Sequence, residues 1–251
     1  PQAVNVLLTA QHVIAAIRLR SDDGKVWIRL NGNDGREIWH ETSEHMWLHD
    51  GSSIDCSVLC WNPRSSGLDA DILGFHLDSV ADDETIAQEG IGVGDEVFIV
   101  GLFRNHLGRD RNEPIVRVGN IAALPVDPIP SRFFGDMRAI LVEARSIGGL
   151  SGSPVFAHLG YARWRADAQS VRYFTGETPF WLLGVMHGHW EMDEAHVDEL
   201  LADERGESIH SGIAVVTPGE QVMALLRPIM DPIVARAAEA IGEQDIAVSS
   251  E

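Results

Sequence analysis

The hydrophobic pattern along the chain is mostly that of β-strands. Short apolar and β-branched runs recur between glycine, proline and Asn/Asp residues, and such a pattern favours a sandwich or a barrel. Apolar residues at helical spacing concentrate near the C-terminus, at Pro218–Leu226 and Pro232–Ile241. The pattern therefore predicts an all-β protein with a C-terminal helix. The predicted strands are Val4–Leu8, Lys25–Leu30, Ile54–Cys60, Asp95–Gly101, Ile115–Leu124, Arg138–Ala144, Ser153–Ala157, Pro179–Met186 and Gly212–Val216.

The composition excludes several classes of protein. The 251 residues include 19 basic and 38 acidic side chains, which gives a formal net charge of −19. This charge disfavours binding to nucleic acid and to an anionic membrane surface, because like charges repel. With 45% hydrophobic residues the chain can bury a core, so a disordered acidic chain is excluded. No apolar run is long enough to cross a bilayer.

Cysteine usage points to a compartment. Cys56 and Cys60 lie four residues apart in one apolar run. In an extended strand that separation is roughly 13 Å, which is too far for a disulfide. A domain of this size without a disulfide is typical of a reducing environment, so we expect a cytoplasmic protein. The chain begins at Pro1, and a signal peptide could precede it.

The segment Gly148–Pro154 reads Gly-Gly-Leu-Ser-Gly-Ser-Pro and places Ser151 between glycines. Glycine permits backbone angles and close approaches that a Cβ would prevent, so this serine can sit exposed on a tight turn. The amides of Gly149 and Ser151 could then point at one spot, as an oxyanion hole requires. A simple Gly/Ser turn between two strands explains the segment about equally well.

A serine nucleophile needs a base and an acid that orients this base. The candidate base is His12, in Thr-Ala-Gln-His at the end of the first apolar run. With this motif upstream and Gly-Leu-Ser-Gly-Ser-Pro downstream, the sequence resembles the trypsin-like (chymotrypsin-fold) serine proteases. Among them it is most similar to bacterial intracellular peptidases without disulfides. The runs at 93–101, 115–122 and 180–188 also resemble strands of that family.

This resemblance implies two six-stranded antiparallel β-barrels of the chymotrypsin/trypsin type that share a cleft. We expect the first barrel at residues 1–110, the second at 111–217, and a C-terminal helix with a tail at 218–251. The run at 93–101 resembles the last strand of the first barrel. Because only eleven residues precede His12, we expect the first barrel to lack its N-terminal strands in this chain.

The orienting acid has two candidates, Asp55 and Asp71, and each begins a run that resembles the Asp-Ile-Ala-Leu-Leu strand of the family. Asp55 lies 43 residues after His12 and 96 before Ser151, whereas Asp71 lies 59 after and 80 before. The first spacing is nearer to that of the family, so we expect Asp55. Either residue alone could be an ordinary strand-edge carboxylate. The implied activity is that of a serine endopeptidase that hydrolyses peptide bonds through an acyl-enzyme.

Substrate preference and activation follow from the same resemblance. Leu150 occupies the position where secreted members carry an aspartate, so we expect no activation by insertion of a new N-terminus. Arg145 aligns with the floor of the specificity pocket, and His187, Gly188 and His189 lie on the strand that lines the cleft. These side chains would favour an acidic residue before the scissile bond. A surface position for Arg145, in solvent or paired with an acid, is the stronger alternative.

We expect no cofactor and no metal. The histidines of His40–His45 have the wrong spacing for a zinc helix, and a solvated acidic loop at Glu191–Glu207 explains the ligand-like residues after His187. The expected partner is a peptide or protein substrate, and further domains could be fused to this one. The main alternative function is a catalytically silent chymotrypsin-fold module that binds a peptide or protein partner.

Overall fold

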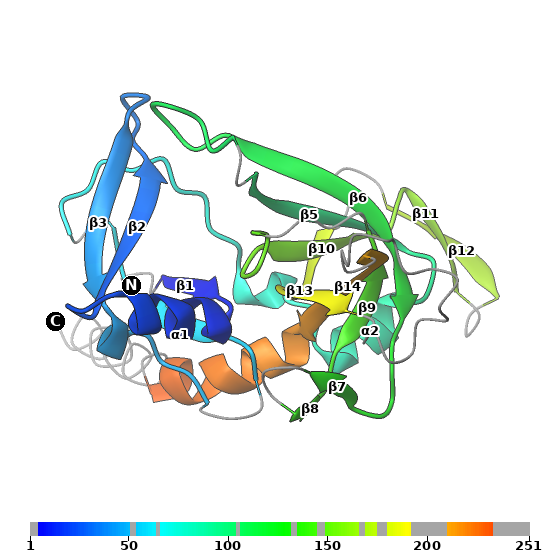
Figure 1. Ribbon diagram of the computed structural model, residues 1–251. Coiled ribbons are helices and arrows are strands. Elements are labelled where there is room, and N and C mark those ends of the chain that lie inside the picture. Colours follow the sequence, from blue (N-terminus) through cyan, green and yellow to red (C-terminus); the bar gives the residue numbers. More distant parts are fainter. Residues whose placement is uncertain are drawn as a thin grey trace, which may run out of the picture.

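The main feature of the fold is a closed antiparallel barrel of six strands, in the order β10-β13-β14-β9-β6-β5 (Figure 1). The computed structural model describes residues 5–50, 54–63, 66–103, 106–131, 135–144, 149–165, 169–174, 180–191 and 210–232. The barrel and a C-terminal helix agree with the predicted all-β class and with a chymotrypsin-type fold. The barrel strands are β5 (Glu96–Leu102), β6 (Pro114–Ala123), β9 (Ile140–Glu143), β10 (Pro154–His158), β13 (Phe180–Glu191) and β14 (His210–Pro218).

The barrel interior is filled by the inward-facing residues of these strands. Val97 and Ile99 of β5 and Val155 and Ala157 of β10 are fully buried, and they pack in one cluster with Leu183 of β13. Alternate residues of a strand face opposite sides, which explains why these fully buried residues are two positions apart in β5 and in β10. Each of the fully buried valine, isoleucine and leucine side chains stabilises the fold by roughly 1.5–3 kcal/mol.

Residues before the barrel form two separate two-stranded sheets in the described part of the chain. Strand β1 (Val6–Thr9) pairs with β4 (Ser57–Cys60), and β2 (Lys25–Asn31) forms a hairpin with β3 (Glu37–Ser43). Helix α1 (Gln11–Arg20) follows β1 directly. The predicted first barrel is therefore not confirmed.

The pairing of strand β5 corrects the prediction that this strand ends the first barrel. The resemblance of its sequence predicts a place at the end of the first barrel, but β5 pairs with β6 along its whole length and with β10 on its other side. Strands that follow one another in sequence usually pair, and β5 and β6 do so as a hairpin of the closed barrel. The expected boundary between residues 110 and 111 falls inside this hairpin. The other boundaries stay predictions.

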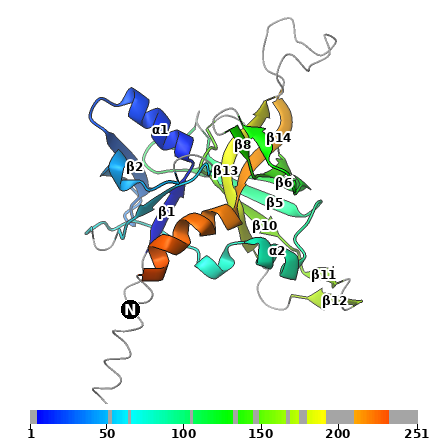
Figure 2. The same cartoon turned by 90° about the horizontal axis from the view of Figure 1, so that it is seen from below.

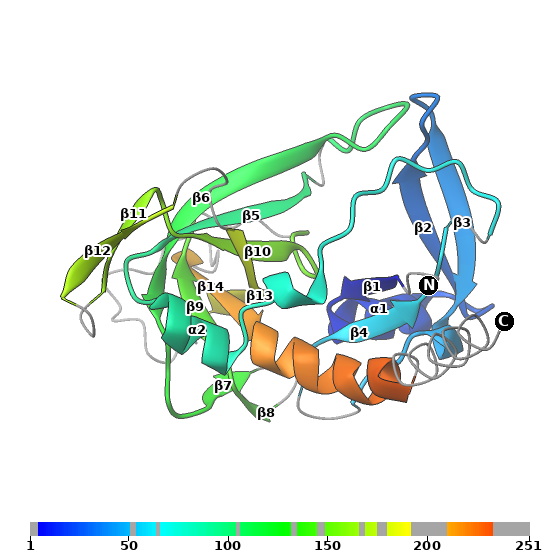
Figure 3. The ribbon, with the colours of Figure 1, turned by 180° about the vertical axis from the view of Figure 1, so that it is seen from behind.

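The C-terminal helix joins the two parts of the molecule. Residues 219–232 are helical, directly after β14. Val222 and Leu226 of this helix pack in one buried cluster with Cys56 and Val58 of the β4 segment and with Val185 of β13. Figures 2 and 3 show the helix running from the barrel to the sheet of β1 and β4. It thereby fixes the β4 segment against β13, where the candidate site lies.

The remaining elements lie at the periphery. Two small hairpins accompany the barrel, together with one short α-helix and two 3₁₀ turns. No helix in the described ranges is long and apolar enough to span a membrane. Cys56 is buried and Cys60 is exposed, and both are free thiols. The peripheral elements are α2 (Asp83–Glu89), β7 (Ile129–Ser131), β8 (Gly135–Met137), β11 (Ala162–Arg165), β12 (Ser170–Tyr173), Glu44–Met46 and Leu77–Ser79.

Candidate active site

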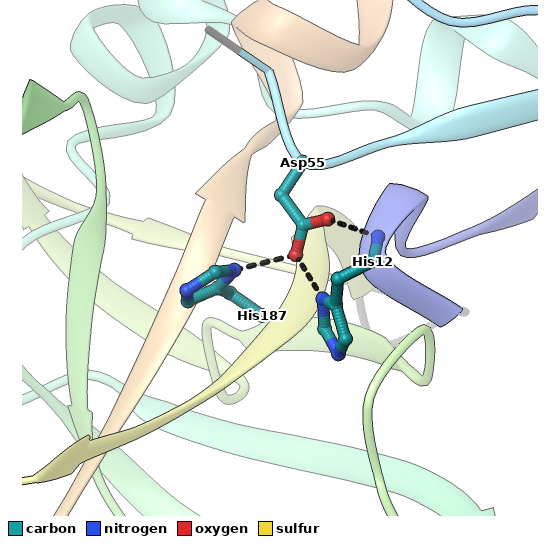
Figure 4. Close-up of side chains that lie close together, drawn as sticks. All are labelled: His12, Asp55 and His187. Carbon is teal, nitrogen blue, oxygen red and sulfur yellow. Dashed lines mark hydrogen bonds and ion pairs between the residues drawn. The ribbon is translucent and has the colours of Figure 1, made fainter. Parts of the chain in front are cut away.

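Asp55 is the centre of a cluster with two histidines (Figure 4). Its side chain is completely buried just before β4. Oδ2 lies 2.7 Å from Nδ1 of His12 and 2.5 Å from Nδ1 of His187. The two imidazole rings meet edge to face with their centroids 5.5 Å apart. The cluster thus joins α1, the segment before β4, and β13.

His12 is held by its backbone as well as by its ring. It lies in the first turn of α1, where the N-cap residue Ala10 supplies no side-chain hydrogen bond. Backbone N–H groups in the first turn of a helix have no partner within the helix. Asp55 Oδ1 accepts the His12 N–H at 2.9 Å, so the carboxylate caps the helix and also binds the ring that the helix carries.

The environment keeps Asp55 ionised. Burial alone would raise the pKa of its carboxyl group, but the hydrogen bonds from His12 and His187 outweigh burial and lower the pKa to about 2. At neutral pH the cluster therefore contains a buried carboxylate that accepts hydrogen bonds and donates none.

This lowered pKa predicts a pH dependence of stability. Because the folded-state pKa lies below the ordinary value of 3.8, the contribution is complete above about pH 4 and is lost as the pH falls towards 2. Its expected size is roughly 2 kcal/mol. Urea unfolding of the wild type and of Asp55→Asn at pH 7 and at pH 2.5 measures it, since the free-energy difference between the two proteins should shrink on acidification. A pH-independent difference would contradict this prediction.

The turn that carries Ser151 packs against the chain just before His12. The Gly152 amide donates to the carbonyl oxygen of Met186 at 2.8 Å, which anchors the turn to β13. A Cβ on Gly152 would come within 2.4 Å of Thr9 Oγ1 and 3.0 Å of the Ala10 nitrogen. Only glycine permits this approach, so the turn and the start of α1 are neighbours.

The Ser151 hydroxyl points elsewhere than to the predicted base. It donates to the carbonyl oxygen of His187 at 3.2 Å, and among the described residues it makes no hydrogen bond to His12. Gly149 has φ of +105°, an angle that glycine adopts readily. The convergence of the Gly149 and Ser151 amides on one point stays a prediction.

The other predicted residues are distributed differently. Asp71 is exposed, and its carboxylate lies 4.0 Å from Arg111. Gly188 lies on β13 beside open space, since a Cβ there would meet no atom within 4 Å. His189 lies half-buried on the same strand. Arg145 and most of the acidic segment Glu191–Glu207 lie outside the described residues. The substrate-binding roles stay predictions.

Two contacts of the site were not predicted from sequence. His187 was expected to line the substrate cleft, but its side chain is buried and bonded to Asp55, 132 residues away. Ser131 lies next to it, with Oγ 3.3 Å from His187 Nε2. The only sequence signal for these contacts was the position of His187 on a predicted cleft strand. No rule of sequence spacing links His187 to Asp55 or to Ser131.

The close approach at Gly152 makes a testable prediction. Gly152→Ala should destabilise the fold, because φ is +84° and the new methyl group would overlap Thr9. Gly35 has φ of +82° but nothing within 4 Å, so Gly35→Ala is a matched control for backbone strain alone. We expect about 1 kcal/mol for the control and a further 1–3 kcal/mol, roughly, for Gly152→Ala. Denaturant unfolding measures both, and equal losses would contradict the packing described.

No family model matches the chain, and no curated protein does. Similar solved structures are Deg5 (19% identity, 74% of this chain and 70% of that one, TM-score 0.43) and the MamO protease domain from Magnetospirillum magneticum (11%, 88% and 82%, 0.47). Another is the HtrA-type protease AlgW with a decapeptide (19%, 92% and 50%, 0.47), of which the chain spans half. Since all three TM-scores lie below 0.5, the functional assignment rests on the site. Two of the three, the MamO domain and AlgW, are proteases by name.

Proposed function

We propose that the protein is a trypsin-like serine endopeptidase in which His12 is the general base, Asp55 the orienting acid and Ser151 the nucleophile. The observation that carries the proposal is the 2.7 Å contact between His12 Nδ1 and a completely buried, ionised Asp55. The serine turn packs against the residues directly before this histidine.

In the proposed mechanism, the contact between Asp55 and His12 prepares the histidine to activate the nucleophile. The Asp55 carboxylate accepts a hydrogen bond from Nδ1–H of His12, which leaves the lone pair of the neutral imidazole on Nε2. Nε2 takes the Ser151 proton as Oγ attacks the peptide carbonyl, and it returns this proton to the leaving amine. Water then hydrolyses the acyl-enzyme by the same route. The Gly149 and Ser151 amides would stabilise the oxyanion, and each such donor contributes roughly 10²–10³-fold to the rate.

Ser151 must change rotamer for this reaction. Its bond to the His187 carbonyl is a resting contact of a neutral hydroxyl, worth about 1 kcal/mol. Ser151 is half-buried, and rotation about its χ1 breaks only this one hydrogen bond. Hydrogen bonds between catalytic groups are often loose without substrate, so the resting contact is compatible with catalysis.

The same contact supports a second candidate function, a chymotrypsin-fold module that binds a peptide or protein partner without cleaving it. In such a module His187 would permanently hold both the serine, through its carbonyl, and Asp55, through its ring. The two functions share every described strand and differ only in whether Ser151 reaches His12.

Incubation of the purified protein with casein, an unstructured substrate, distinguishes the two functions. A peptidase should cleave casein, a sulfonyl fluoride should stop cleavage, and a chelator should not. Binding of peptides without cleavage, measured by fluorescence anisotropy on a labelled peptide library, would favour the binding module and overturn the proposed activity.

A further inference from the structure

The cluster around Asp55 has the composition of a metal site. His12 Nδ1, Asp55 Oδ2 and His187 Nδ1 lie within 4.8 Å of one another, and each is an atom that binds zinc. Three protein ligands with an open fourth position are the usual pattern of an accessible zinc site. We propose that these three residues bind a divalent transition-metal ion such as Zn²⁺, and that the bound ion inhibits the enzyme. The inhibitory part rests on the proposed function, whereas the binding part does not.

The ligand atoms need small movements only. At metal–ligand distances of about 2.0–2.2 Å, neighbouring ligands of a tetrahedral ion lie roughly 3.3 Å apart. The present separations of Asp55 Oδ2 from the two imidazole nitrogens are 2.7 and 2.5 Å, so each would open by less than about 1 Å. The ion would take the place between these atoms that the two N–H hydrogens occupy now.

Surrounding hydrogen bonds hold the ligands in place. A histidine that binds metal through one ring nitrogen usually donates a hydrogen bond from the other. Ser131 Oγ lies 3.3 Å from His187 Nε2 and can accept this hydrogen bond. Asp55 Oδ1 is already occupied by the His12 N–H, which leaves Oδ2 as the metal-binding oxygen. This arrangement fixes both the carboxylate and one ring before an ion arrives.

An ion can reach the cluster from the side of His12. The exposed fractions of the side chains are 21% for His12, 9% for His187 and 0% for Asp55. The net charge of −19 raises the concentration of divalent cations near the surface. Two nitrogen ligands select Zn²⁺ or Co²⁺ over Mg²⁺ and Ca²⁺, because these harder cations prefer sites of oxygen atoms alone.

Metal binding and catalysis exclude one another for a chemical reason. When Nδ1 of His12 binds the ion, the neutral imidazole keeps its proton on Nε2. Nε2 then has no lone pair for the Ser151 proton. The ion also occupies the carboxylate that would stabilise a protonated imidazole. Bound metal should therefore inhibit by removing the general base, without blocking the place where substrate binds.

Calorimetry with Zn²⁺ and the absorption spectrum of the Co²⁺ complex test the binding in full-length Ser151→Ala protein, which cannot digest itself. We expect one site per chain, no signal with Mg²⁺, and at least about 10-fold weaker binding in proteins that also carry His187→Ala or His187→Gln. The side-chain amide of glutamine can still donate a hydrogen bond to Asp55, so the His187→Gln protein should remain folded. Loss of Zn²⁺ binding in this variant would therefore reflect the loss of a metal ligand. His158→Ala is the matched control, because His158 contacts a single carboxylate, that of Glu96, at 2.9 Å.

The inhibitory part is measured as the ratio of wild-type hydrolysis rates with and without Zn²⁺, followed by recovery with chelator. Undiminished binding in both His187 variants, or no binding, would overturn the metal site. Binding to an active protein without inhibition would overturn the inhibitory role. A wild-type protein that binds Zn²⁺ through His187 but cleaves nothing would overturn the proposed function and leave the metal site standing.

Discussion

Replacement of Ser151 by alanine should abolish peptide hydrolysis. The hydroxyl oxygen is the atom that forms the acyl-enzyme, and loss of a nucleophilic serine from a triad lowers kcat by roughly 10⁶-fold. The turn should keep its shape, because the Gly152 amide and not the Ser151 side chain ties it to β13. The cleavage rate of a fluorogenic peptide from the casein digest measures the effect.

Ser153→Ala is the matched control for this experiment. Ser153 lies two residues further along the same turn, its side chain is largely buried, and its backbone carries the hydrogen bonds to Leu150 and Met186. This variant should keep its rate within about 3-fold, as a change outside the reacting atoms does. Equal losses in the two variants would mean that the turn collapses, and undiminished hydrolysis by Ser151→Ala would exclude Ser151 as the nucleophile.

Replacement of Asp55 by asparagine has the second largest expected effect, a loss of about 10⁴-fold in kcat. An asparagine that presents its NH₂ group to His12 favours the tautomer with the proton on Nε2, and this tautomer cannot accept the Ser151 proton. The carboxylate also stabilises the imidazolium that forms during attack. KM should change little, because Asp55 is buried behind the histidine.

Asp71→Asn separates the two candidate acids. The Asp71 side chain is 62% exposed beside Arg111, and a weak surface pair of this kind contributes little to stability. This variant should behave as the wild type. A large loss of activity in Asp71→Asn with a normal rate in Asp55→Asn would show that the family's spacing had selected the wrong residue and that the described cluster has another role.

The strands of the barrel were predictable, and their partners were not. Short apolar and β-branched runs located β5, β6, β10, β13 and β14 within a few residues, because buried strands require apolar side chains. The same pattern is silent on which barrel a strand joins, so β5 was placed with the wrong neighbours. Pairing of β5 with β10 depends on contacts between distant segments.

Two further elements escaped prediction for local reasons. Helix α1 buries Ile14 but exposes Leu19, and it has no capping side chain at Ala10, so its sequence lacks the usual helix signals. Asp55 supplies the cap from a distant segment. Strand β3 is rich in polar residues on both faces: Glu37 and Glu41 are exposed, and Thr42 is buried on the other face.

The candidate site, like the fold, was predictable only in part. Short motifs around His12 and Ser151 were recognisable, because glycines and small residues are required where a serine turn meets another segment. Asp55 was selected by its distance along the chain. The second histidine at Asp55 and the resting bond of Ser151 depend on three segments that meet only in the folded protein, so neither could be predicted.

Reaction with diisopropyl fluorophosphate, followed by mass spectrometry, tests the triad most directly. This reagent modifies a serine only when a neighbouring base activates it. We predict one adduct per chain on the peptide that contains Ser151, and a labelling rate at least about 100-fold lower in His12→Ala. No adduct on the folded wild-type protein, or equal labelling of His12→Ala, would contradict the proposed triad.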